Sequence, residues 1–348
     1  MRDLSFKDFL SKYQKVPFEE YPNRVLETVP APKVSVVIST YNHAGFIREC
    51  LDGALMQETD FPFEILIGED QSNDGTREIC IEYARRFPEK IRLFLHRREN
   101  NILVDGQPTG NFQLTTSLFI SRAPYIAFCE GDDYWTDPSK LQKQFDLLES
   151  QPAFSVTYHS ASIIDATGRQ ISADMSPEWM RANVSALELR CNRRPLTLTS
   201  FFRNVFDTIP EEFIRILNAD SFLFSFLGIK GAGYFHQDIA NAAYRKHSGG
   251  IWSTKSPAEQ IKYQQKTSWE ILKYHCRVKS DVETIRFWEK RGAFVQFFGL
   301  NSIAFRKNPI SYVLGFLSQS LSLIGHGKSR LVRAFVVHKI ARLVRDSF

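Results

Sequence analysis

The chain has 348 residues, of which 43% are hydrophobic and 24% are charged. This balance excludes a disordered chain and indicates one large domain with an appendage, or two smaller domains. The five scattered cysteines lack Cys-x-x-Cys spacing, which argues against a disulfide framework or a zinc site and for a reducing cytoplasm. The net charge of +5 is carried entirely by residues 308–348, and because no nucleic-acid-binding motif accompanies it, we expect no nucleic acid partner.

The first predicted elements form a βαβ unit. Residues 1–32 read as an amphipathic lead-in without a secretory signal, since four prolines break any long helix. Residues 33–40 are rich in β-branched side chains, the signature of a strand buried on both faces. The apolar spacing of residues 46–55 predicts a helix, and residues 63–67 predict a second strand. Two strands joined in this way should be parallel.

The same alternation continues toward the middle of the chain. We predict a helix over residues 76–87, a strand over 91–96, a loop over 100–111, a helix over 111–122 and a strand over 124–128. Alternating strands and helices are typical of a doubly wound sheet. The first, second and fourth strands each end in polar residues at the carboxyl edge, where open α/β sheets bind ligands. We therefore expect the site at this edge.

The fourth strand runs into an acidic turn that contains Glu130, Asp132 and Asp133. Adjacent carboxylates repel one another and are costly to desolvate, and a bound cation relieves both effects. Mg²⁺ and Mn²⁺ prefer one or two carboxylates together with phosphate oxygens. A solvated acidic turn that caps the next helix would equally explain the two aspartates alone, so both explanations stay open at this point.

The second half of the chain carries weaker patterns. Residues 154–164 and 196–202 predict strands, and residues 210–227 predict a helix that is broken near residue 218. A Gly-rich segment then leads into a strand that ends at Tyr244, and residues 254–307 form a predicted helical region. Neither a repeat nor a low-complexity segment interrupts this order.

The last segment of the chain, residues 308–348, has two parts. Residues 308–327 contain no Asp, Glu, Lys or Arg, but Pro309 and the glycines and serines of this segment make it a poor membrane-spanning helix. From residue 328 onward basic and apolar residues interleave, a pattern typical of an amphipathic helix at an anionic membrane surface. A helix packed on the domain with a solvated basic face is the alternative.

Four segments in order along this framework carry a family resemblance: residues 36–42, 68–76, 130–135 and 244–250. Together they resemble the family 2 glycosyltransferases over roughly residues 33–253. The resemblance implies a GT-A fold, a Rossmann-like doubly wound mixed α/β sheet, followed here by a C-terminal helical extension. It further implies a nucleotide-diphosphate sugar as donor, inversion at the anomeric carbon, and Mn²⁺ or Mg²⁺ as cofactor.

The resemblance assigns donor-binding roles to individual residues. Ser39, Thr40 and Tyr41 lie where the family holds the nucleoside, with the Tyr41 ring beside the base, and packing is the alternative for this ring. Asp70 matches the carboxylate that accepts a hydrogen bond from the ring N–H of the base, which favours a uracil- or thymine-like base and, of the two, a UDP-sugar as donor. The remaining donor-binding candidates are Asp132, the lid residues Arg245 and Lys246, and Asn111. Asn111 is either a helix cap or a contact with the donor. Arg97 and Arg98 are weaker candidates for contact with the phosphates.

The resemblance also supplies metal ligands and a base. Asp133 matches the direct metal ligand, Asp132 lies nearer the ribose or a metal-bound water, and His247 is a further candidate ligand through its neutral imidazole. A base must take the proton of the acceptor hydroxyl, and Asp220 fits that position. Asp220 is otherwise an ordinary helix cap, and Asp238 is the second candidate base.

These roles describe a metal-dependent glycosyltransferase that moves a single sugar to a hydroxyl of a glycan or lipid-linked glycan, in cell-surface polysaccharide synthesis. The Gln-x-x-Arg-Trp motif of processive synthases is absent, which favours one transfer per encounter. We expect a cytoplasmic protein that is peripheral on the inner face of the membrane. The alternatives are a catalytically degenerate scaffold that binds nucleotide sugars and a sugar nucleotidyltransferase, whose usual Gly-rich phosphate loop is missing after the first strand.

Overall fold

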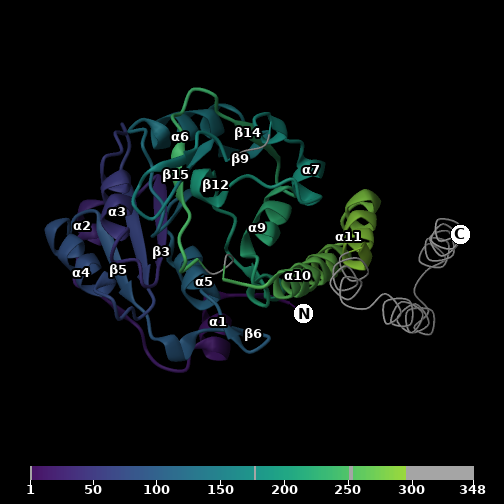
Figure 1. The fold of residues 1–348 in the computed structure, drawn as a ribbon, viewed down its shortest axis with the longest axis horizontal. Coiled ribbons are helices and arrows are strands. Elements are labelled where there is room, and N and C mark those ends of the chain that lie inside the picture. The colour runs from purple at the N-terminus through teal and green to yellow at the C-terminus, as the bar shows by residue number, and fades with distance from the viewer. Residues whose placement is uncertain (1, 176–177, 251–253, 295–348) are drawn as a thin grey trace, which may run out of the picture.

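The computed structural model describes residues 2–175, 178–250 and 254–294. An eight-stranded mixed sheet runs through it in the order β14-β9-β12-β8-β3-β4-β5-β2 (Figure 1). Its central strands β8, β3, β4 and β5 are parallel, as the predicted βαβ units require, whereas β12 runs antiparallel to both of its neighbours. The strands are β2 (Glu19–Glu20), β3 (Val34–Thr40), β4 (Phe63–Glu69), β5 (Ile91–Leu95), β8 (Tyr125–Glu130), β9 (Phe154–Tyr158), β12 (Phe201–Arg203) and β14 (Ala232–Phe235).

Helices cover both faces of this sheet, which confirms the doubly wound α/β prediction. Alternate side chains of one strand enter different cores: Val36 and Ile38 pack toward one layer of helices, and Val37 packs toward the other. Because both faces are covered, β3 and β4 are buried along nearly their whole length. One layer holds α3 (Ile47–Leu55), α4 (Thr76–Arg86) and α6 (Lys140–Ser150), and the other holds α1 (Phe6–Tyr13), α5 (Asn111–Ile120), α8 (Glu211–Ile214), α9 (Ala219–Leu227) and α10 (Pro257–Arg277).

A second, three-stranded sheet lies next to the acidic turn. It has the order β11-β10-β15, and its strand β15 forms a bridge to Tyr134 through Ala243. The single strand predicted over residues 154–164 is wrong, because the chain bends at His159 and Ser160 and its two halves enter different sheets. The strands of the second sheet are β10 (Ala161–Ile164), β11 (Gln170–Ser172) and β15 (Ala242–Arg245).

The N-terminal lead-in packs on the main sheet. The Phe9 ring of α1 stacks on the Phe112 ring of α5 with 5.3 Å between centroids, and β2 pairs with β5 at the edge of the sheet. The helix α1 begins where Ser5 accepts a hydrogen bond from the Asp8 amide. Short elements in this and the following segments are β1 (Asp3–Leu4), α2 (Val25–Thr28), a 3₁₀ turn at Arg98–Asn100, β6 (Leu103–Val104), β7 (Gln107–Pro108), 3₁₀ turns at Glu178–Met180 and Thr197–Thr199, α7 (Ala186–Arg190) and β13 (Ile209–Pro210).

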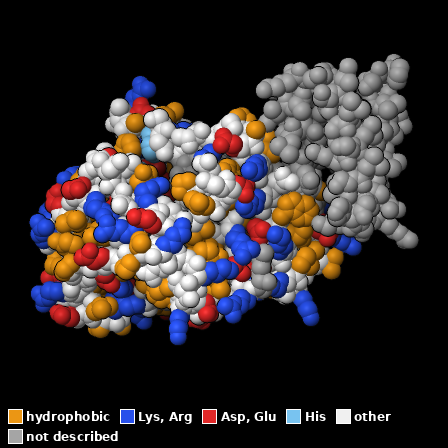
Figure 2. Space-filling view, turned by 90° about the horizontal axis from the view of Figure 1, so that it is seen from below, with side chains coloured by type: hydrophobic (Ala, Val, Ile, Leu, Met, Phe, Trp, Pro, Cys, Tyr) orange, Lys and Arg blue, Asp and Glu red, His pale blue; other side chains and the backbone are white. Residues whose placement is uncertain are grey.

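Two long helices, α10 and α11 (Val282–Phe294), lie at one end of the molecule beside α8 and α9 (Figure 1). A capping box fixes the start of α10, where Ser256 and Glu259 satisfy each other's backbone amides and Pro257 occupies the first turn. The predicted membrane-surface tail, residues 308–348, lies outside the described residues. On the face shown in Figure 2, basic and acidic side chains are interspersed over the described surface rather than gathered by sign.

Candidate active site

The carboxyl ends of β3, β4 and β8 meet at one edge of the sheet. In the strand register Thr40 lies opposite Glu69, and Ser39 lies opposite Glu130. The backbone continues this pairing past the strands, since the Asp70 amide donates to the Thr40 carbonyl (3.1 Å) and the Gly131 amide donates to the Ser39 carbonyl (3.0 Å). The predicted meeting of these strand ends at one edge is therefore confirmed, and it brings the three polar turns together, whereas the role of this edge as the site stays a prediction.

Asp70 is the centre of the first cluster at this edge. Its buried Oδ2 accepts hydrogen bonds from Arg98 Nη1 and Asn101 Nδ2, both at 2.9 Å. Within the described residues Oδ1 has no partner although it is buried. Burial raises the pKa of Asp70 to about 6, and the bonds from Asn101 and Arg98 oppose that rise. The Arg98 guanidinium lies 3.9 Å from the centroid of the partly exposed Tyr41 ring, so Tyr41, Arg98 and Asp70 form one group.

Two further acidic residues of this turn support its backbone. Glu69 is fully buried, and its carboxylate pairs with Arg77 and accepts from the amide of Ser72 at 2.6 Å. Asp74 accepts from the amide (3.0 Å) and the hydroxyl (2.6 Å) of Thr76, the first residue of α4, and from the Ala44 amide (3.0 Å). Both side chains therefore hold the turn that presents Asp70.

Asp132 faces two histidines from different parts of the chain. Its Oδ2 lies 2.9 Å from His247 Nε2 and 4.0 Å from His43 Nε2, and one atom from each of the three residues lies within 4.8 Å of the others. Gly131 permits this approach, because a Cβ there would stand 2.6 Å from Thr40 Oγ1 and 2.9 Å from His43 Nδ1. The geometry therefore offers one carboxylate and two imidazoles to a single ion.

The protonation of this group suits that role. Burial acts to raise the pKa of Asp132, but the hydrogen bond from His247 and the neighbouring His43 outweigh it, so the pKa is lowered. Burial lowers the pKa of His43, which favours the neutral imidazole that can act as a ligand. His43 is brought there by the turn after β3, in which Asn42 takes a left-handed conformation (φ 55°) and the His43 amide donates to Thr76 Oγ1.

The other two carboxylates of the acidic turn are more deeply placed. Asp133 is 3% exposed, and its Oδ1 accepts from the Arg245 amide at 2.7 Å. Burial, followed by the charges of Asp132 and Glu130, raises its pKa. Burial and then the charge of Asp132 raise the pKa of Glu130 to about 8, and the charge of Asp220 adds to this rise. The predicted role of Asp133 as a direct ligand stays a prediction.

Arg245 is buried beneath the acidic turn. Its side chain is 1% exposed, and it donates from Nη2 to Glu49 (2.6 Å) and from Nε to the Asp132 carbonyl (2.9 Å). A third donor, Nη1, reaches the Asp165 carbonyl at 3.2 Å. Lys246 is exposed. The contacts predicted for Arg245 and Lys246 with the donor diphosphate stay predictions, and the contacts present tie β15 to the acidic turn.

The two candidate bases lie in different surroundings. Asp220, in the first turn of α9, accepts from the Ser221 amide (2.8 Å) and forms an ion pair with Arg194. Its influence on the pKa of Glu130 places it within electrostatic reach of the acidic turn. Asp238 is 64% exposed and pairs with His236 Nδ1 at 3.1 Å. Of the two, Asp220 is the one that acts on the acidic turn.

Asn111 has a contact within the fold. It is buried at the start of α5, and its side-chain amide donates to the carbonyls of Ile214 and Ile216. These two carbonyls precede α9, so Asn111 helps to fix the segment that presents Asp220. The predicted contact between Asn111 and the donor stays a prediction.

The family model for glycosyl transferase family 2 matches residues 35–209, just over half of the chain, and this region contains the strand ends described above. The chain belongs to glycosyltransferase family 2. Among its relatives, an uncharacterized protein of Mycobacterium tuberculosis is 36% identical over 220 residues, which cover 63% of this family 2 chain and 60% of that protein. The chain therefore matches less than two thirds of the length of this relative.

Two further matches connect the family 2 chain to named proteins. TuaG of Bacillus subtilis, named as a teichuronic acid biosynthesis glycosyltransferase, is 31% identical over 137 residues, which cover 39% of this chain and 50% of TuaG. The structure of TarS residues 1–349 from S. aureus, in complex with UDP-GlcNAc, is similar with a TM-score of 0.54 and 20% identity, over 79% of this chain and 76% of that one. At this identity the likeness shows the fold, which is GT-A.

One member of the candidate site was missed by the reasoning from sequence. His43 follows Tyr41 and Asn42 at the end of the first strand, and a polar turn in that place was the signal that could have found it.

A separate observation concerns membranes: in residues 2–175, 178–250 and 254–294, no helix has both the length and the apolar character needed to cross a bilayer.

Proposed function

We propose that the protein is an inverting glycosyltransferase that moves one sugar from a UDP-sugar to a hydroxyl of a glycan or lipid-linked glycan in cell-surface polysaccharide synthesis. The observation that carries this proposal is the shared edge of the sheet, where the Asp70 group and the Asp132 group stand at the ends of β4 and β8, on either side of β3. The TarS complex with UDP-GlcNAc supports the donor class, and TuaG supports the polysaccharide context.

The Asp70 group suits a nucleoside. Oδ1 of Asp70 is an acceptor that is buried and, among the described residues, unpartnered, so it can accept a hydrogen bond from the ring N–H of uracil. The Tyr41 ring offers a flat face beside it, and stacking of a base on an aromatic ring contributes about 1–3 kcal/mol. Ser39 and Thr40, at the end of β3, lie between this group and the acidic turn.

The residues present fit a divalent cation. One carboxylate and two imidazoles, from Asp132, His43 and His247, suit Mn²⁺ better than Mg²⁺, which prefers oxygen ligands alone. When bound there, such an ion supplies charge neutralisation for the departing nucleotide diphosphate. Arg245 holds the acidic turn in place through the Asp132 carbonyl and the Asp133 carboxylate.

Asp220 is the proposed base. It accepts the proton of the acceptor hydroxyl while that oxygen bonds to the anomeric carbon and the bond from this carbon to the diphosphate breaks. A single displacement of this kind inverts the anomeric carbon and needs no carboxylate nucleophile. Arg194 keeps Asp220 oriented through their ion pair and a hydrogen bond to Ser221.

A donor screen tests this function. Nucleotide diphosphate release is measured for UDP-, GDP- and TDP-sugars with Mn²⁺, with Mg²⁺ and with a chelator. We expect release from a UDP-sugar that is highest with Mn²⁺. Release that is the same with the chelator as with Mn²⁺ would contradict the metal assignment, and no release from any donor would contradict the activity.

We further propose that residues 308–348 attach the enzyme to the inner face of the cytoplasmic membrane. The basis is the sequence pattern of basic and apolar residues in this segment. A chain truncated after residue 307 should no longer sediment with vesicles that contain anionic lipid, whereas the full chain should. Equal sedimentation of both chains would contradict the anchor.

A further inference from the structure

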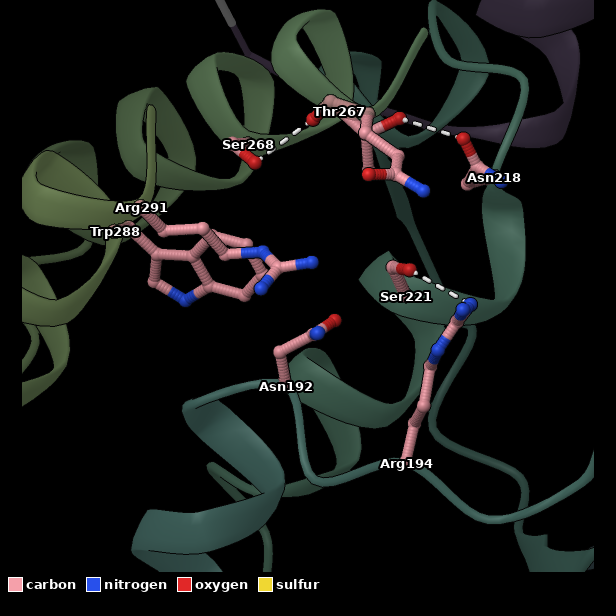
Figure 3. A pocket seen from close by; sticks show the side chains of 9 residues that line it. Asn192, Arg194, Asn218, Ser221, Thr267, Ser268, Trp288 and Arg291 are labelled. Carbon is pink, nitrogen blue, oxygen red and sulfur yellow. Dashed lines mark hydrogen bonds between the residues drawn. The ribbon is translucent and has the colours of Figure 1, made fainter. Parts of the chain in front are cut away.

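A pocket beside the candidate base carries more positive than negative charge (Figure 3). It is a small, open pocket with a cavity volume of about 20 Å³ between α9, the helices α10 and α11, and the segment that follows α7. Its lining includes Arg194 and Arg291 and contains no acidic residue. Arg194 forms an ion pair with Asp220, whereas Arg291 forms none within the described residues, so the charge of one arginine is balanced and that of the other is not.

Arg291 is the unbalanced charge. Within the described residues its guanidinium takes part in no hydrogen bond and no ion pair, and its one recorded contact is with the Trp288 ring, 6.0 Å from the centroid. Figure 3 shows it lying along the indole with its end directed into the pocket. Burial, followed by the charge of Arg194, lowers the pKa of Arg291. Two half-buried guanidinium groups that repel each other are stabilised when an anion enters between them.

Neutral donors complete the lining. The side-chain amides of Asn192 and Gln264 make no hydrogen bond in the described part of the chain, so both are available to a ligand. The Trp288 N–H is not available to a ligand, because it donates to the Arg190 carbonyl at 2.7 Å. The indole ring therefore serves as an apolar wall of the pocket. Figure 3 shows Arg194 and Asn192 reaching the space from another side than Arg291.

These donors select a kind of anion. Guanidinium groups bind phosphate and carboxylate through paired N–H donors. Donors that approach from several sides match a tetrahedral group, whose oxygens point in several directions, better than a planar one. The ion pair of Arg194 also joins the pocket to Asp220, so a bound anion would lie next to the proposed base.

We propose that this pocket binds a phosphate group carried by the acceptor and so presents the acceptor hydroxyl to Asp220. The inference rests on the proposed function, because it takes Asp220 as the base. Both a polymer with phosphodiester links and a lipid-linked pyrophosphate offer such a group. The role of α10 and α11 is then to complete the acceptor side of the site with Arg291 and Gln264.

Binding of inorganic phosphate to the full chain tests the pocket directly. Titration calorimetry at constant ionic strength compares the wild type with Arg291→Gln and Arg291→Lys. Because hydrogen bonds to charged groups contribute about 1.5–3 kcal/mol, we expect the Kd for phosphate to rise about 10-fold or more in Arg291→Gln and less in Arg291→Lys. An unchanged Kd in Arg291→Gln overturns the proposal.

Arg286→Gln is the matched control, since Arg286 is an exposed arginine on the same helix. Its Kd for phosphate should equal that of the wild type, and an equal loss in both variants would overturn the proposal because it would reflect net charge alone. If Arg291→Gln fails to fold, as judged by thermal melting, Gln264→Ala replaces it. This variant should weaken phosphate binding several-fold, about the effect of one hydrogen bond, and wild-type affinity in it contradicts the proposal.

Competition experiments distinguish the two acceptor sources. Glycerol 3-phosphate represents a phosphodiester polymer and geranyl pyrophosphate represents a lipid-linked acceptor, and each is added to the phosphate-bound protein. Displacement of phosphate by either compound supports an acceptor-borne phosphate and names its class. Displacement by neither overturns it.

Kinetics separate this inference from the proposed function. In Arg291→Gln the KM for the acceptor should rise about 10-fold, while donor hydrolysis in the absence of acceptor stays at the wild-type rate. Sugar transfer with an unchanged acceptor KM would overturn the phosphate pocket and leave the glycosyltransferase activity intact. Absence of turnover together with Arg291-dependent phosphate binding would overturn the activity and leave the anion site intact.

Discussion

The strand-end site and the pocket beside Asp220 are built in different ways. At the strand ends, backbone register positions the residues: Ser39 stands opposite Glu130, and Thr40 stands opposite Glu69. In the pocket, side chains from α9, α11 and the segment after α7 converge without any shared register. The first site therefore depends on the sheet, and the second depends on how the C-terminal helices pack.

The two regions also differ in charge. At the strand ends, burial and the neighbouring carboxylate of Asp132 raise the pKa of Glu130 to about 8, which marks a place where negative charge is in excess and a cation is favoured. Two arginines line the pocket, and of these Arg194 alone is paired with a carboxylate, that of Asp220. One region thus suits a metal ion and the other an anionic group, and Asp220 stands between them. The following experiments test this division of roles.

The largest effect is expected at Asp220, which belongs to both regions. Asp220→Asn keeps the shape of the side chain but removes the proton acceptor, so the transfer rate should fall by about 10²–10⁴-fold with little change in the donor KM. Steady-state kinetics with a saturating acceptor measure it. Asp238→Asn is the control variant and should keep the wild-type transfer rate. If the transfer rate falls in Asp238→Asn and stays at the wild-type value in Asp220→Asn, then Asp238 is the base.

A smaller loss of transfer is expected from the acidic turn. Asp132→Asn removes the one carboxylate that faces both histidines, and we expect Mn²⁺-dependent transfer to fall about 10²–10³-fold. Asp133→Asn replaces a carboxylate that already accepts from the Arg245 amide. Mn²⁺ titration of both variants decides which aspartate is the ligand, since the affinity for Mn²⁺ should drop further in the variant that lacks the ligand carboxylate. A larger drop in Asp133→Asn would restore the order predicted from the sequence.

Arg245 should have a smaller effect, because it acts through the backbone of the acidic turn. A lysine at this position cannot reach Glu49, the Asp132 carbonyl and the Asp165 carbonyl at once. We expect Arg245→Lys to weaken Mn²⁺ affinity by roughly 10–100-fold, the size of effect that residues behind metal ligands usually have. Arg48→Lys, at an exposed ion pair with Glu82, is the control and should bind Mn²⁺ normally. Equal affinities in all three proteins would show that Arg245 does not position the turn.

The strand-end site could largely be predicted from the sequence. Buried β-branched strands that alternate with helices specify the sheet, and the sheet then places Asp70 and Asp132 at the ends of β4 and β8, the two strands that flank β3, whatever their separation along the chain. His43 escaped this reasoning because the direction of a side chain in a turn follows from backbone angles such as the left-handed Asn42, and hydrophobic periodicity does not reveal these. Arg245 was found as a candidate, but its burial was not, because arginine is rarely buried unless it is paired and its partner Glu49 lies far away in the sequence.

The pocket could not be predicted in the same way. Arg291 lies in a helical pattern, and nothing in that pattern states which side chains it will meet. Its position opposite Arg194 depends on the packing of α11 against the end of α7, where the Arg190 carbonyl accepts from the Trp288 N–H and the Arg190 side chain donates to Thr284. Contacts of this kind are set by the whole core rather than by local sequence. For the same reason, the strand predicted over residues 196–202 begins with a 3₁₀ turn at Thr197–Thr199, and β12 starts only at Phe201.

The smallest effect is expected at Lys140, which packs on Trp135 behind the acidic turn, and it concerns stability rather than transfer. Its ammonium group is fully buried 4.1 Å from the Trp135 ring and donates to Gln144, and burial lowers its pKa to about 7. Between about pH 7 and the ordinary lysine pKa near 10.4, the unfolded chain therefore binds one more proton than the folded protein. The free energy of unfolding should rise with pH in this window, by at most about 1.4 kcal/mol per pH unit. Lys140→Met should remove this rise, whereas Lys33→Met, at an exposed position, should keep it. Urea unfolding at pH 7, 8 and 9 measures the difference. If Lys140→Met and the wild type show the same pH dependence, the buried lysine carries its charge at neutral pH and the Trp135 ring, not burial, dominates its protonation.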